Sequence, residues 1–444
     1  MSAKRYDLVV VGAGSAGAAC ALAAARYGLR VALLERQRFD KAGARWVNGV
    51  PGWCFDAAGL ARPAAPEARG AGKHGRFHLV GGYGPRRLVI DDLDSYDVDM
   101  RRLVERLQRE AATHGVEMID EATVTAFNRG GVSTTSGELR TDLVVDASGW
   151  TGARLLPRQP LAVTDLCAAA QEVRRVSDPA AALAFFHENQ AEPGDIICFS
   201  GVEGGYSILN LRLEGDEFSI LTGSIPSDGR LSGQAMIRRF VREHPFIGER
   251  IFGGARVIPL APANPCLVGG RVALLGDSGC QVFAAHGSGV GAGLVAARML
   301  ADAVAQDNSL WAYNVAWQRK LGGLFASSYL FARYSRTLSG ADIGEMLESG
   351  AMSEASVRAT MTQQLPRLGF GDLYGMGRAV TRIPRRLRGL VPVISASAGL
   401  QLHYRRYPEK RSDLPRWLAG LRRWLWLGGI SRGDLDRHVP PITG

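Results

Sequence analysis

The chain is 444 residues long, with 46% hydrophobic and 22% charged residues, enough for one large domain or two intertwined domains with a full core. Its 55 glycines follow no three-residue period, which excludes collagen. The charged fraction, the eight tryptophans and the lack of a low-complexity tract argue against a disordered chain. No window of about 18 uninterrupted apolar residues occurs, and residues 1–7 lack the apolar run of a secretion signal. We therefore expect a cytoplasmic protein.

Cysteine spacing and charge narrow the function classes further. The six cysteines are too far apart for a disulfide framework or a zinc site, so no metal is expected. The net charge of +10 arises within residues 351–444, which carry 16 basic and 6 acidic residues. This uneven distribution argues against nucleic-acid binding by the whole chain. It favours contact of the C-terminal segment with an anionic partner, phospholipid first.

The first predicted elements form a strand, a glycine-rich turn and a helix. Tyr6–Val11 is a continuous apolar run, as in a strand buried on both faces of a parallel sheet. A G-x-G-x-x-G motif and an alanine-rich helix over residues 16–27 follow it. Such glycines let the backbone approach a pyrophosphate at the start of a helix. The motif residues are Gly12, Gly14, Ser15 and Gly17.

The second predicted strand, Arg30–Leu34, ends in an acidic residue, Glu35. A carboxylate at this position accepts hydrogen bonds from ribose hydroxyls. It favours a dinucleotide without a 2′-phosphate, which means FAD or NAD rather than NADP.

A second glycine-rich junction follows the predicted strand Arg271–Leu275. Gly276 and Asp277 come directly after this strand, and a glycine run over residues 287–293 leads into a small-residue helix. NAD alone does not explain two such junctions. A carboxylate can hold a polyol such as ribityl, and glycines leave room for a flat ring with N–H donors beside it. The dinucleotide is therefore expected to be FAD.

Three segments together justify naming a family: residues 9–17, residues 145–149 and the run from Gly276 to Val290. They resemble the FAD-dependent oxidoreductases typified by para-hydroxybenzoate hydroxylase. Within that superfamily they look most like the geranylgeranyl reductase branch. The resemblance covers about residues 5–330. It implies an α/β fold with a discontinuous FAD-binding Rossmann-like domain, an antiparallel-sheet substrate domain and a helical C-terminal region.

The resemblance also implies which residues contact FAD. The family usually places an arginine at the start of a helix, where this chain has Met100, so Arg101 is the candidate replacement. Val124 would meet the adenine through its backbone. The implied contacts are Gly12, Gly14, Ser15, Gly17, Glu35, Arg36, Arg101, Val124, Gly149, Asp277, Gly287, Gly289, Val290 and Gly291.

The family's substrate motifs are not reproduced. The tryptophan and proline expected after Tyr206 are absent, and residues 44–49 lack the cysteine that archaeal reductases place over the flavin. Single-component hydroxylases carry an aspartate that helps engage NAD(P)H where this chain has Ser148. A separate electron donor, either NAD(P)H or a reduced protein carrier, is therefore expected.

Catalytic and pocket candidates follow from position. His286 is the ionisable side chain of the expected flavin loop, and an imidazole with a pKa near ~6.5 suits proton transfer. A structural histidine is the alternative. Cys280 is either a redox thiol or a small buried hydrophobe. Residues expected near the flavin ring or the substrate are Arg45, Trp46, Asn48, Ile208, Asn210 and Leu221.

The domain boundaries follow changes in pattern. Residues 1–160 would form the first part of the FAD domain, with a substrate-side insert near 45–95. Residues 161–258 would form the antiparallel substrate domain, and 259–330 the rest of the FAD domain. Residues 331–444 form a basic helical region, in which 414–427 have one apolar face. That face would lie in a membrane interface, peripherally at the inner membrane surface, or would pack on the catalytic domain.

The expected function is redox chemistry on a hydrophobic, isoprenoid or lipid-like molecule. In the leading hypothesis, reduced flavin delivers hydride to a C=C bond and His286 or water supplies a proton. The alternative is a monooxygenase or halogenase that acts through a flavin C4a-hydroperoxide; a halogenase would need a lysine, for which Lys73 is the candidate. A redox partner is possible in either case. A third hypothesis makes FAD structural in a membrane-bound binding protein.

Overall fold

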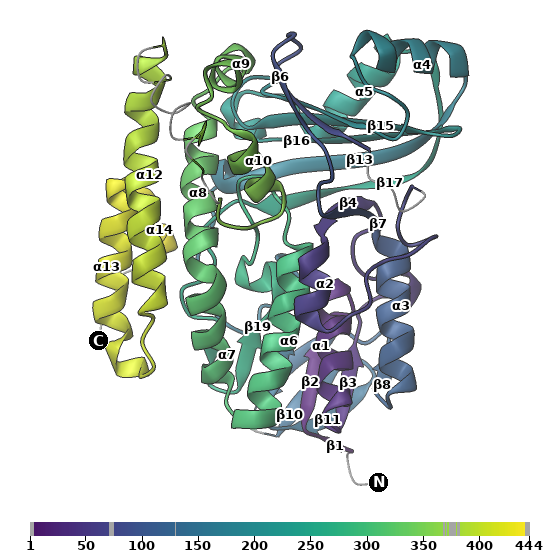
Figure 1. Cartoon of the computed structure of the whole chain (residues 1–444). Coiled ribbons are helices and arrows are strands. Elements are labelled where there is room, and N and C mark those ends of the chain that lie inside the picture. The colour runs from purple at the N-terminus through teal and green to yellow at the C-terminus, as the bar shows by residue number, and fades with distance from the viewer. Residues whose placement is uncertain are drawn as a thin grey trace.

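The computed structural model describes residues 4–70, 75–128, 130–366, 369, 371–372, 379 and 382–439. The helical layers and the upper sheet are shown in Figure 1. The helices of the dinucleotide-binding half lie below one wide sheet, and a group of long helices flanks both.

A six-stranded sheet forms the centre of the dinucleotide-binding half, in the order β18-β19-β12-β2-β3-β8. Its strands are parallel except for β18. The central strands are short, buried runs of Val and Leu, which suits a sheet covered on both faces. The strands are β2 (Leu8–Val11), β3 (Val31–Leu34), β8 (Glu117–Ile119), β12 (Val144–Asp146), β18 (Val268–Gly269) and β19 (Val272–Leu274).

Helices cover one face of this sheet and a small second sheet covers the other. Leu8, Val10 and Leu33 share a core cluster with the helices, whereas Val9 and Val11 pack against the second sheet. The helices are α1 (Ser15–Arg26), α2 (Gly52–Ala58), α3 (Met100–Thr113) and α6 (Val290–Asp307), with η1 (Phe39–Lys41) beside them. The second sheet contains β1 (Arg5–Tyr6), β9 (Val124–Asn128), β10 (Gly131–Thr134) and β11 (Gly137–Thr141).

The sequence predicted one strand over Tyr6–Val11, but the structure divides this segment between two sheets. Tyr6 belongs to β1, which pairs with β11, and the central strand β2 begins at Leu8. The break at Asp7 has a physical cause. The Asp7 carboxylate accepts hydrogen bonds from the backbone and guanidinium of Arg30 at 2.8 and 2.6 Å.

A seven-stranded sheet forms the second half, in the order β17-β13-β16-β15-β14-β5-β6. Neighbouring strands are antiparallel except β14 and β5. Two of its strands, β5 and β6, come from the insert near residues 45–95. The strands are β5 (Phe77–Gly81), β6 (Arg87–Ile90), β13 (Leu166–Val176), β14 (Ile196–Ser200), β15 (Ser207–Glu214), β16 (Glu217–Ser224) and β17 (Ile247–Pro259).

Short elements complete this half. Helices α4 (Pro179–Glu188) and α5 (Gly233–Glu243) cover the outer face of the seven-stranded sheet (Figure 1). The antiparallel pair β4 (Val47–Pro51) and β7 (Ser95–Asp99) joins the two halves. The 3₁₀ turns are η2 (Val163–Asp165), η3 (Pro226–Asp228) and η4 (Gly276–Gly279).

The C-terminal helices form a bundle that begins with a continuous rod. Helix α7 (Leu310–Trp317), a π-helical segment (Gln318–Gly322) and α8 (Gly323–Ser335) run without a break. Helix α12 (Pro384–Arg405) packs on α8, and α13 (Leu414–Leu427) packs on α12. The others are α9 (Gly340–Ser349), α10 (Glu354–Met361), η6 (Arg411–Asp413) and α14 (Arg432–His438).

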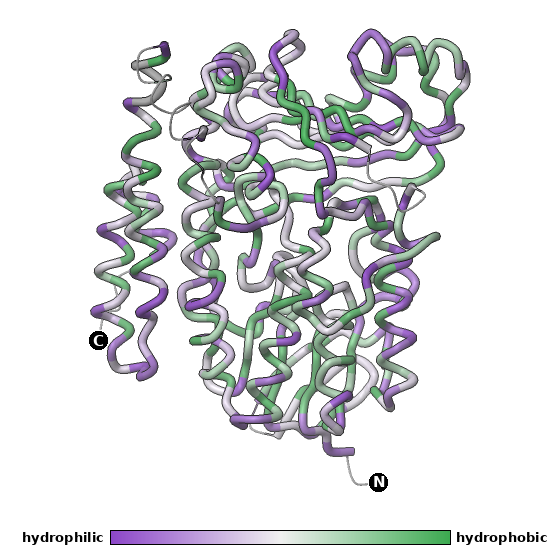
Figure 2. The backbone as a smooth tube through the Cα atoms, in the orientation of Figure 1, coloured by the Kyte–Doolittle hydropathy of each residue, from purple (hydrophilic) through white to green (hydrophobic). Residues whose placement is uncertain are grey.

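The apolar face of α13 is buried within the protein. Hydrophobic and hydrophilic positions alternate along the α12–α13 pair in Figure 2. Leu421 and Leu425 are fully buried, whereas Trp426 is 56% exposed. Of the two interpretations of residues 414–427, the structure therefore supports packing. None of the helices among the described residues is both long enough and apolar enough to span a bilayer.

Candidate FAD site and substrate cavity

The turn between β2 and α1 contains three glycines whose Cβ positions have different surroundings. A Cβ on Gly12, whose φ is +103°, would lie 2.5 Å from the Ala147 carbonyl oxygen. A Cβ on Gly17 would lie 1.9 Å from the Gly12 oxygen, so strand and helix could not meet as closely. Gly14, by contrast, is not crowded: a Cβ there would make an ordinary contact with the Gly43 Cα at 3.5 Å, and no side chain caps α1. The free N–H groups at this helix start fit a pyrophosphate.

Glu35 lies at the carboxyl end of β3 and turns toward this junction. Its carboxylate accepts hydrogen bonds from the backbone N–H groups of Ala13, at 2.9 Å, and Gln37, at 3.1 Å. These bonds fix the side chain while leaving lone pairs for ribose hydroxyls. Arg36 next to it is exposed. Val124 begins β9 close by, since the Glu35 carbonyl accepts the N–H of Ala122.

The second junction lies beside the first. A Cβ on Gly276 or on Gly293 would each contact the Ala16 Cβ, at 3.3 and 3.1 Å. Helix α6 also begins without a side-chain cap, at Gly289. A Cβ on Gly289 would lie 3.2 Å from Asp277 Oδ1. Two uncapped helix starts, backbone that excludes side chains and a carboxylate thus converge, which fits FAD along its length.

Asp277 is exposed at this convergence, although many protein atoms surround its carboxyl group. This desolvation raises the pKa of its carboxyl group, and the charge of Arg256 partly opposes the shift. Such a carboxylate is suited to accept hydrogen bonds from polyol hydroxyls.

The segment after β12 ties the two junctions together. Asp146 is fully buried and pairs with Arg158 at 2.8 Å. Ser278 donates a hydrogen bond to the Asp146 carboxylate at 3.1 Å and accepts the N–H of Gly149 at 3.0 Å. Burial raises the pKa of Asp146, but Arg158 and Ser148 lower it more, so the net shift is downward. The ionised carboxylate therefore organises this turn.

The Arg101 side chain is engaged with neighbouring residues. Its guanidinium forms two hydrogen bonds with the Asp99 carboxylate, at 2.9 and 2.6 Å, and lies 3.5 Å from the centre of the Phe252 ring. Met100 is buried in the core. In the described geometry the Arg101 guanidinium is paired with Asp99 and Phe252, and its contact with FAD stays a prediction.

The loop before α6 is fixed by hydrogen bonds from the seven-stranded-sheet half and from the C-terminal helices. The Tyr206 hydroxyl donates a hydrogen bond to the Ala284 carbonyl at 2.9 Å, and the Ala284 N–H donates to Ser328 Oγ at 3.0 Å. Gly287 has a φ of +71°, and a Cβ there would lie 3.2 Å from the Tyr206 hydroxyl. The seven-stranded sheet and α8 thus set the position of this loop. Gly291 follows it at the start of α6, where a Cβ would meet Cys54 Sγ at 2.6 Å.

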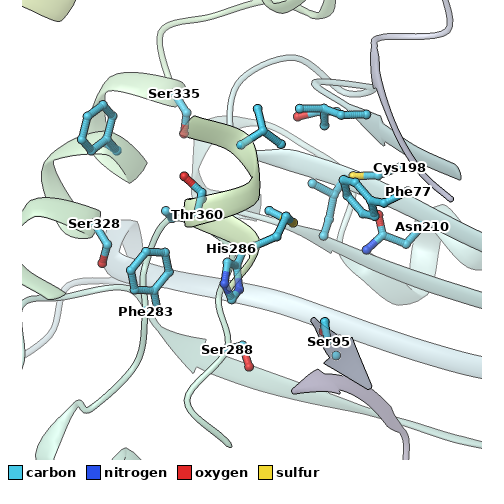
Figure 3. A pocket seen from close by; sticks show the side chains of 18 of the residues that line it. Phe77, Ser95, Cys198, Asn210, Phe283, His286, Ser288, Ser328, Ser335 and Thr360 are labelled. Atoms are coloured by element: carbon cyan, nitrogen blue, oxygen red, sulfur yellow. The ribbon is translucent and has the colours of Figure 1, made fainter. Parts of the chain in front are cut away.

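A cavity of about 630 Å³ opens beside this loop. Its size is typical of sites for small organic ligands. The inner face of the seven-stranded sheet forms one wall and the loop forms another (Figure 3). Asn48 of β4 also lines the cavity. The remaining walls come from α8, α9, α10 and α12. Candidates predicted from the sequence that line it are Asn48, Ile208, Asn210, Leu221 and His286.

Among the polar atoms at the cavity that have no hydrogen-bond partner within the described residues, three lie close to the loop or on the facing strand. They belong to His286 (Nε2), Ser288 (Oγ) and Asn210 (Oδ1). Figure 3 shows these three side chains around the same space. Desolvation lowers the pKa of His286 to about 4, against hydrogen bonds with its own backbone and that of Thr360. At neutral pH the imidazole is therefore uncharged.

The lining of the cavity contains both charged and apolar parts. Arg212 and Asp97 form an ion pair in the lining, as do Arg69 and Glu217. The helices contribute apolar side chains, among them Phe331, Leu390 and Ile394, and two of these are partly exposed. The cavity thus fits a largely apolar molecule that also carries a polar group.

Three predicted residues lie elsewhere. Trp46 is buried, and its ring lies 3.9 Å from the Cβ position of Gly254. Arg45 donates a hydrogen bond to the Asp40 carbonyl rather than lining the cavity. Cys280 is buried, and burial raises the pKa of its thiol to about 12. Lys73 lies outside the described residues.

The sequence did not indicate Arg256 or the walls from α8 and α12. Arg256 stands in a long strand with no local motif, and its place near Asp277 depends on the pairing of β17 with β13. The walls come from amphipathic helices whose pattern does not reveal what they face. Among the described residues, no group of His, Cys, Asp or Glu side chains is arranged to hold a metal.

Comparison with known proteins agrees with this geometry. A family model described as FAD dependent oxidoreductase matches residues 7–88. The digeranylgeranylglycerophospholipid reductase of Sulfolobus acidocaldarius is 22% identical, covering 94% of this chain and 96% of the relative. A digeranylgeranylglycerophospholipid reductase 2 of Methanothermobacter thermautotrophicus is 26% identical over 78% of this chain and 91% of its own.

Solved structures share the fold. A geranylgeranyl bacteriochlorophyll reductase-like protein from Thermoplasma acidophilum matches with a TM-score of 0.66 and 15% identity, over 88% of this chain and 100% of that one. The flavin-dependent brominase Bmp2 matches with a TM-score of 0.59 and 17% identity, over 86% and 100%. The family resemblance drawn from the sequence is confirmed. Residues 7–88 thus match a family model of FAD-dependent oxidoreductases, and the chain has the fold of a geranylgeranyl reductase-like flavoprotein.

Proposed function

We propose that this protein reduces C=C bonds of an isoprenoid or isoprenoid-lipid substrate. The observation that carries the proposal is the cavity of about 630 Å³, which is lined by the loop at His286 and by apolar side chains of α8 and α12. The names of the relatives from Sulfolobus and Methanothermobacter support the same substrate class. A long prenyl chain would bury its apolar surface against these helices.

The residues that would hold FAD are those of the two junctions. The start of α1 would face the pyrophosphate, Glu35 the ribose, Asp277 the ribityl chain, and the loop and start of α6 the flavin ring. Reduced FAD, when bound, supplies a hydride equivalent. The cavity walls would hold a double bond beside the loop and exclude water from it.

His286 is our candidate for moving the proton that each reduced double bond also requires. Its Nε2 faces no protein partner, and Ser288 lies two residues away on the same loop. A pKa of about 4 means that few molecules carry the imidazolium at neutral pH. His286 would thus relay a proton from water. Its protonated fraction would rise about tenfold for each unit of pH decrease between 8 and 5.

An external donor would supply the electrons, either NAD(P)H or a reduced protein carrier. Ser148, at the position where hydroxylases have an aspartate, donates a hydrogen bond to Asp146 at 2.6 Å and accepts the N–H of Ala153 at 2.8 Å. It is thereby occupied within its own turn.

The substrate would reach the cavity from a lipid surface at the apolar rim. Phe331, Leu365 and Ile394 line the cavity and are 38%, 48% and 37% exposed. Val391 beside them is 57% exposed, and Arg388 on the same helix is also exposed. Apolar side chains next to basic ones suit peripheral contact with anionic lipid. This rim, rather than α13, is the expected membrane contact.

The test is a single turnover without oxygen. Photoreduced protein is mixed with a geranylgeranyl lipid, and flavin oxidation and the mass of the lipid are followed. We expect the flavin to be oxidised while the lipid gains two hydrogens per turnover. Flavin oxidation that requires O₂ and inserts oxygen into the lipid would instead indicate the monooxygenase alternative.

A pair of variants separates the cavity from general damage. Leu221→Trp fills the cavity, whereas Leu183→Trp adds the same bulk on α4, outside the cavity lining. We expect both to bind FAD and to be photoreduced. Leu221→Trp alone should lose turnover of the long prenyl chain; equal activity of the two variants would contradict the assignment of the cavity.

A further inference from the structure

One face of β17 lies across the FAD groove. Beyond the positive-φ residue Gly253, alternate residues of this strand point to the same side. A Cβ on Gly254 would lie 3.9 Å from the Trp46 ring, and Ile258 Cδ1 lies 3.9 Å from the Cβ position of Gly287. This face therefore extends from the loop after β3 to the loop before α6. Arg256 stands between Gly254 and Ile258 on that face.

The contacts of Arg256 place its charge between the two helix starts. Its guanidinium donates a hydrogen bond to the Gly43 carbonyl. Gly43 in turn packs on Gly14, where a Cβ would lie 3.5 Å from the Gly43 Cα. On the other side, the charge of Arg256 acts on Asp277, which adjoins Gly289 at the start of α6.

Among the described residues, Arg256 differs from Arg101 nearby in its lack of a carboxylate partner. Arg101 is held by Asp99 and Phe252. Arg256 is exposed, and within the described part of the chain it forms no ion pair with a carboxylate. A pyrophosphate carries two negative charges, and guanidinium groups bind phosphate oxygens with strong, charge-assisted hydrogen bonds.

We propose that Arg256 binds the pyrophosphate of FAD. The cation comes from the seven-stranded sheet, not from the dinucleotide-binding half. FAD would therefore be held between the two halves, and its affinity would depend on their contact along β17. Arg256 is a binding residue, and its role is independent of which substrate the cavity accepts.

The test measures FAD release from the full-length holoprotein, by the recovery of flavin fluorescence on dilution and at increasing salt. Four variants are compared: Arg256→Ala, Arg256→Gln, Arg256→Lys and Arg250→Ala. Glutamine can keep the hydrogen bond to the Gly43 carbonyl without the charge, and lysine keeps the charge. Arg250 is the matched control, because it is an exposed arginine of the same strand that faces Glu172 at 3.9 Å.

We expect Arg256→Ala and Arg256→Gln to raise the dissociation constant of FAD about tenfold or more, as for loss of one charge-assisted hydrogen bond. Arg256→Lys should recover much of the affinity, and Arg250→Ala should bind FAD as the unaltered protein does. The neutral variants should also lose part of the salt dependence. Thermal unfolding of the FAD-free variants checks that they fold.

Two results would overturn the proposal. One is wild-type FAD affinity in Arg256→Gln, which would reduce Arg256 to a brace for the Gly43 loop. The other is equal loss in Arg250→Ala, which would indicate a diffuse effect of positive charge. If Arg256→Ala fails to fold, the comparison between the glutamine and lysine variants still decides.

Discussion

The FAD-binding half and the substrate cavity are built in different ways. At the FAD site, single backbone positions have no alternative, because Gly12 and Gly17 already lie in contact with other backbone atoms. The cavity is lined by side chains from two sheets, the loop before α6 and four helices. The FAD site thus depends on single backbone positions, whereas the cavity depends on side chains from segments that are distant in sequence. Substitutions should therefore act in an all-or-none manner at the first and by degrees at the second.

The sharpest way to break this comparison is Gly17→Val. The new Cβ would overlap the Gly12 carbonyl oxygen, 1.9 Å away, so β2 and α1 must separate. We expect loss of bound FAD and a fall in the free energy of unfolding of about 4 kcal/mol or more. Flavin absorbance of the purified protein and thermal unfolding measure both. Gly433→Ala, where a Cβ would meet nothing within 4 Å, should change neither.

A second variant tests whether a charge organises the same half. Asp146→Ala leaves the Arg158 guanidinium, which is 5% exposed, without its carboxylate. The expected loss is about 3–5 kcal/mol of unfolding free energy. Asp142→Ala is the control, because its carboxylate is 58% exposed and should matter by less than about 1 kcal/mol. Similar losses in both variants would contradict the role of the buried pair.

The Asp146 pair also has a pH dependence of definite sign. The net shift of its pKa is downward in the folded protein. Its stabilisation is therefore complete above the pKa of an unfolded aspartate and is lost as the pH falls through the folded pKa. In Asp146→Ala, unfolding should depend less on pH in this acidic range.

A third variant sharpens the comparison within the C-terminal bundle. Leu421 is fully buried and Trp426 is 56% exposed on the same helix. Leu421→Ala should lower the unfolding free energy by about 2–5 kcal/mol, whereas Trp426→Ala should change it by about 0.5 kcal/mol or less. Calorimetry and vesicle binding are measured together. Weaker vesicle binding of Leu421→Ala at unchanged stability would restore the membrane interpretation of this face.

The smallest effect is expected where the two halves meet. Tyr206→Phe removes the hydroxyl that holds the Ala284 carbonyl at 2.9 Å, at a cost of about 1 kcal/mol. FAD should remain bound while turnover falls a few-fold, because the loop before α6 loosens. Tyr27→Phe removes a hydroxyl bonded to Asp302 at 2.7 Å on the surface and should leave turnover unchanged. Loss of FAD from Tyr206→Phe would mean that the loop is not separable from the cofactor site.

The sequence predicted much of the cofactor half because its signals are local. Gly12, Gly14, Gly17 and Glu35 stand within one strand–helix–strand unit, where spacing alone implies geometry. The role assigned to Arg256 could not be foreseen, since it requires the pairing of β17 with β13 and the path of the loop at Gly43. The sequences of α8 and α13 do not reveal what their apolar residues contact. Tertiary packing alone decides that one lines a cavity and the other fills a core.

The rod formed by α7, the π-helical segment and α8 has a consequence for how this enzyme can diversify. Its first part is bonded to the central sheet, where the Tyr313 hydroxyl donates to the Leu274 carbonyl at 3.0 Å. Its last part carries Ser328, which holds the loop before α6. The same continuous helical rod is therefore bonded both to the central sheet and to the loop that borders the cavity. Substitutions of the α8 side chains that line the cavity should therefore change which substrates fit, while the loop before α6 keeps its position relative to α8.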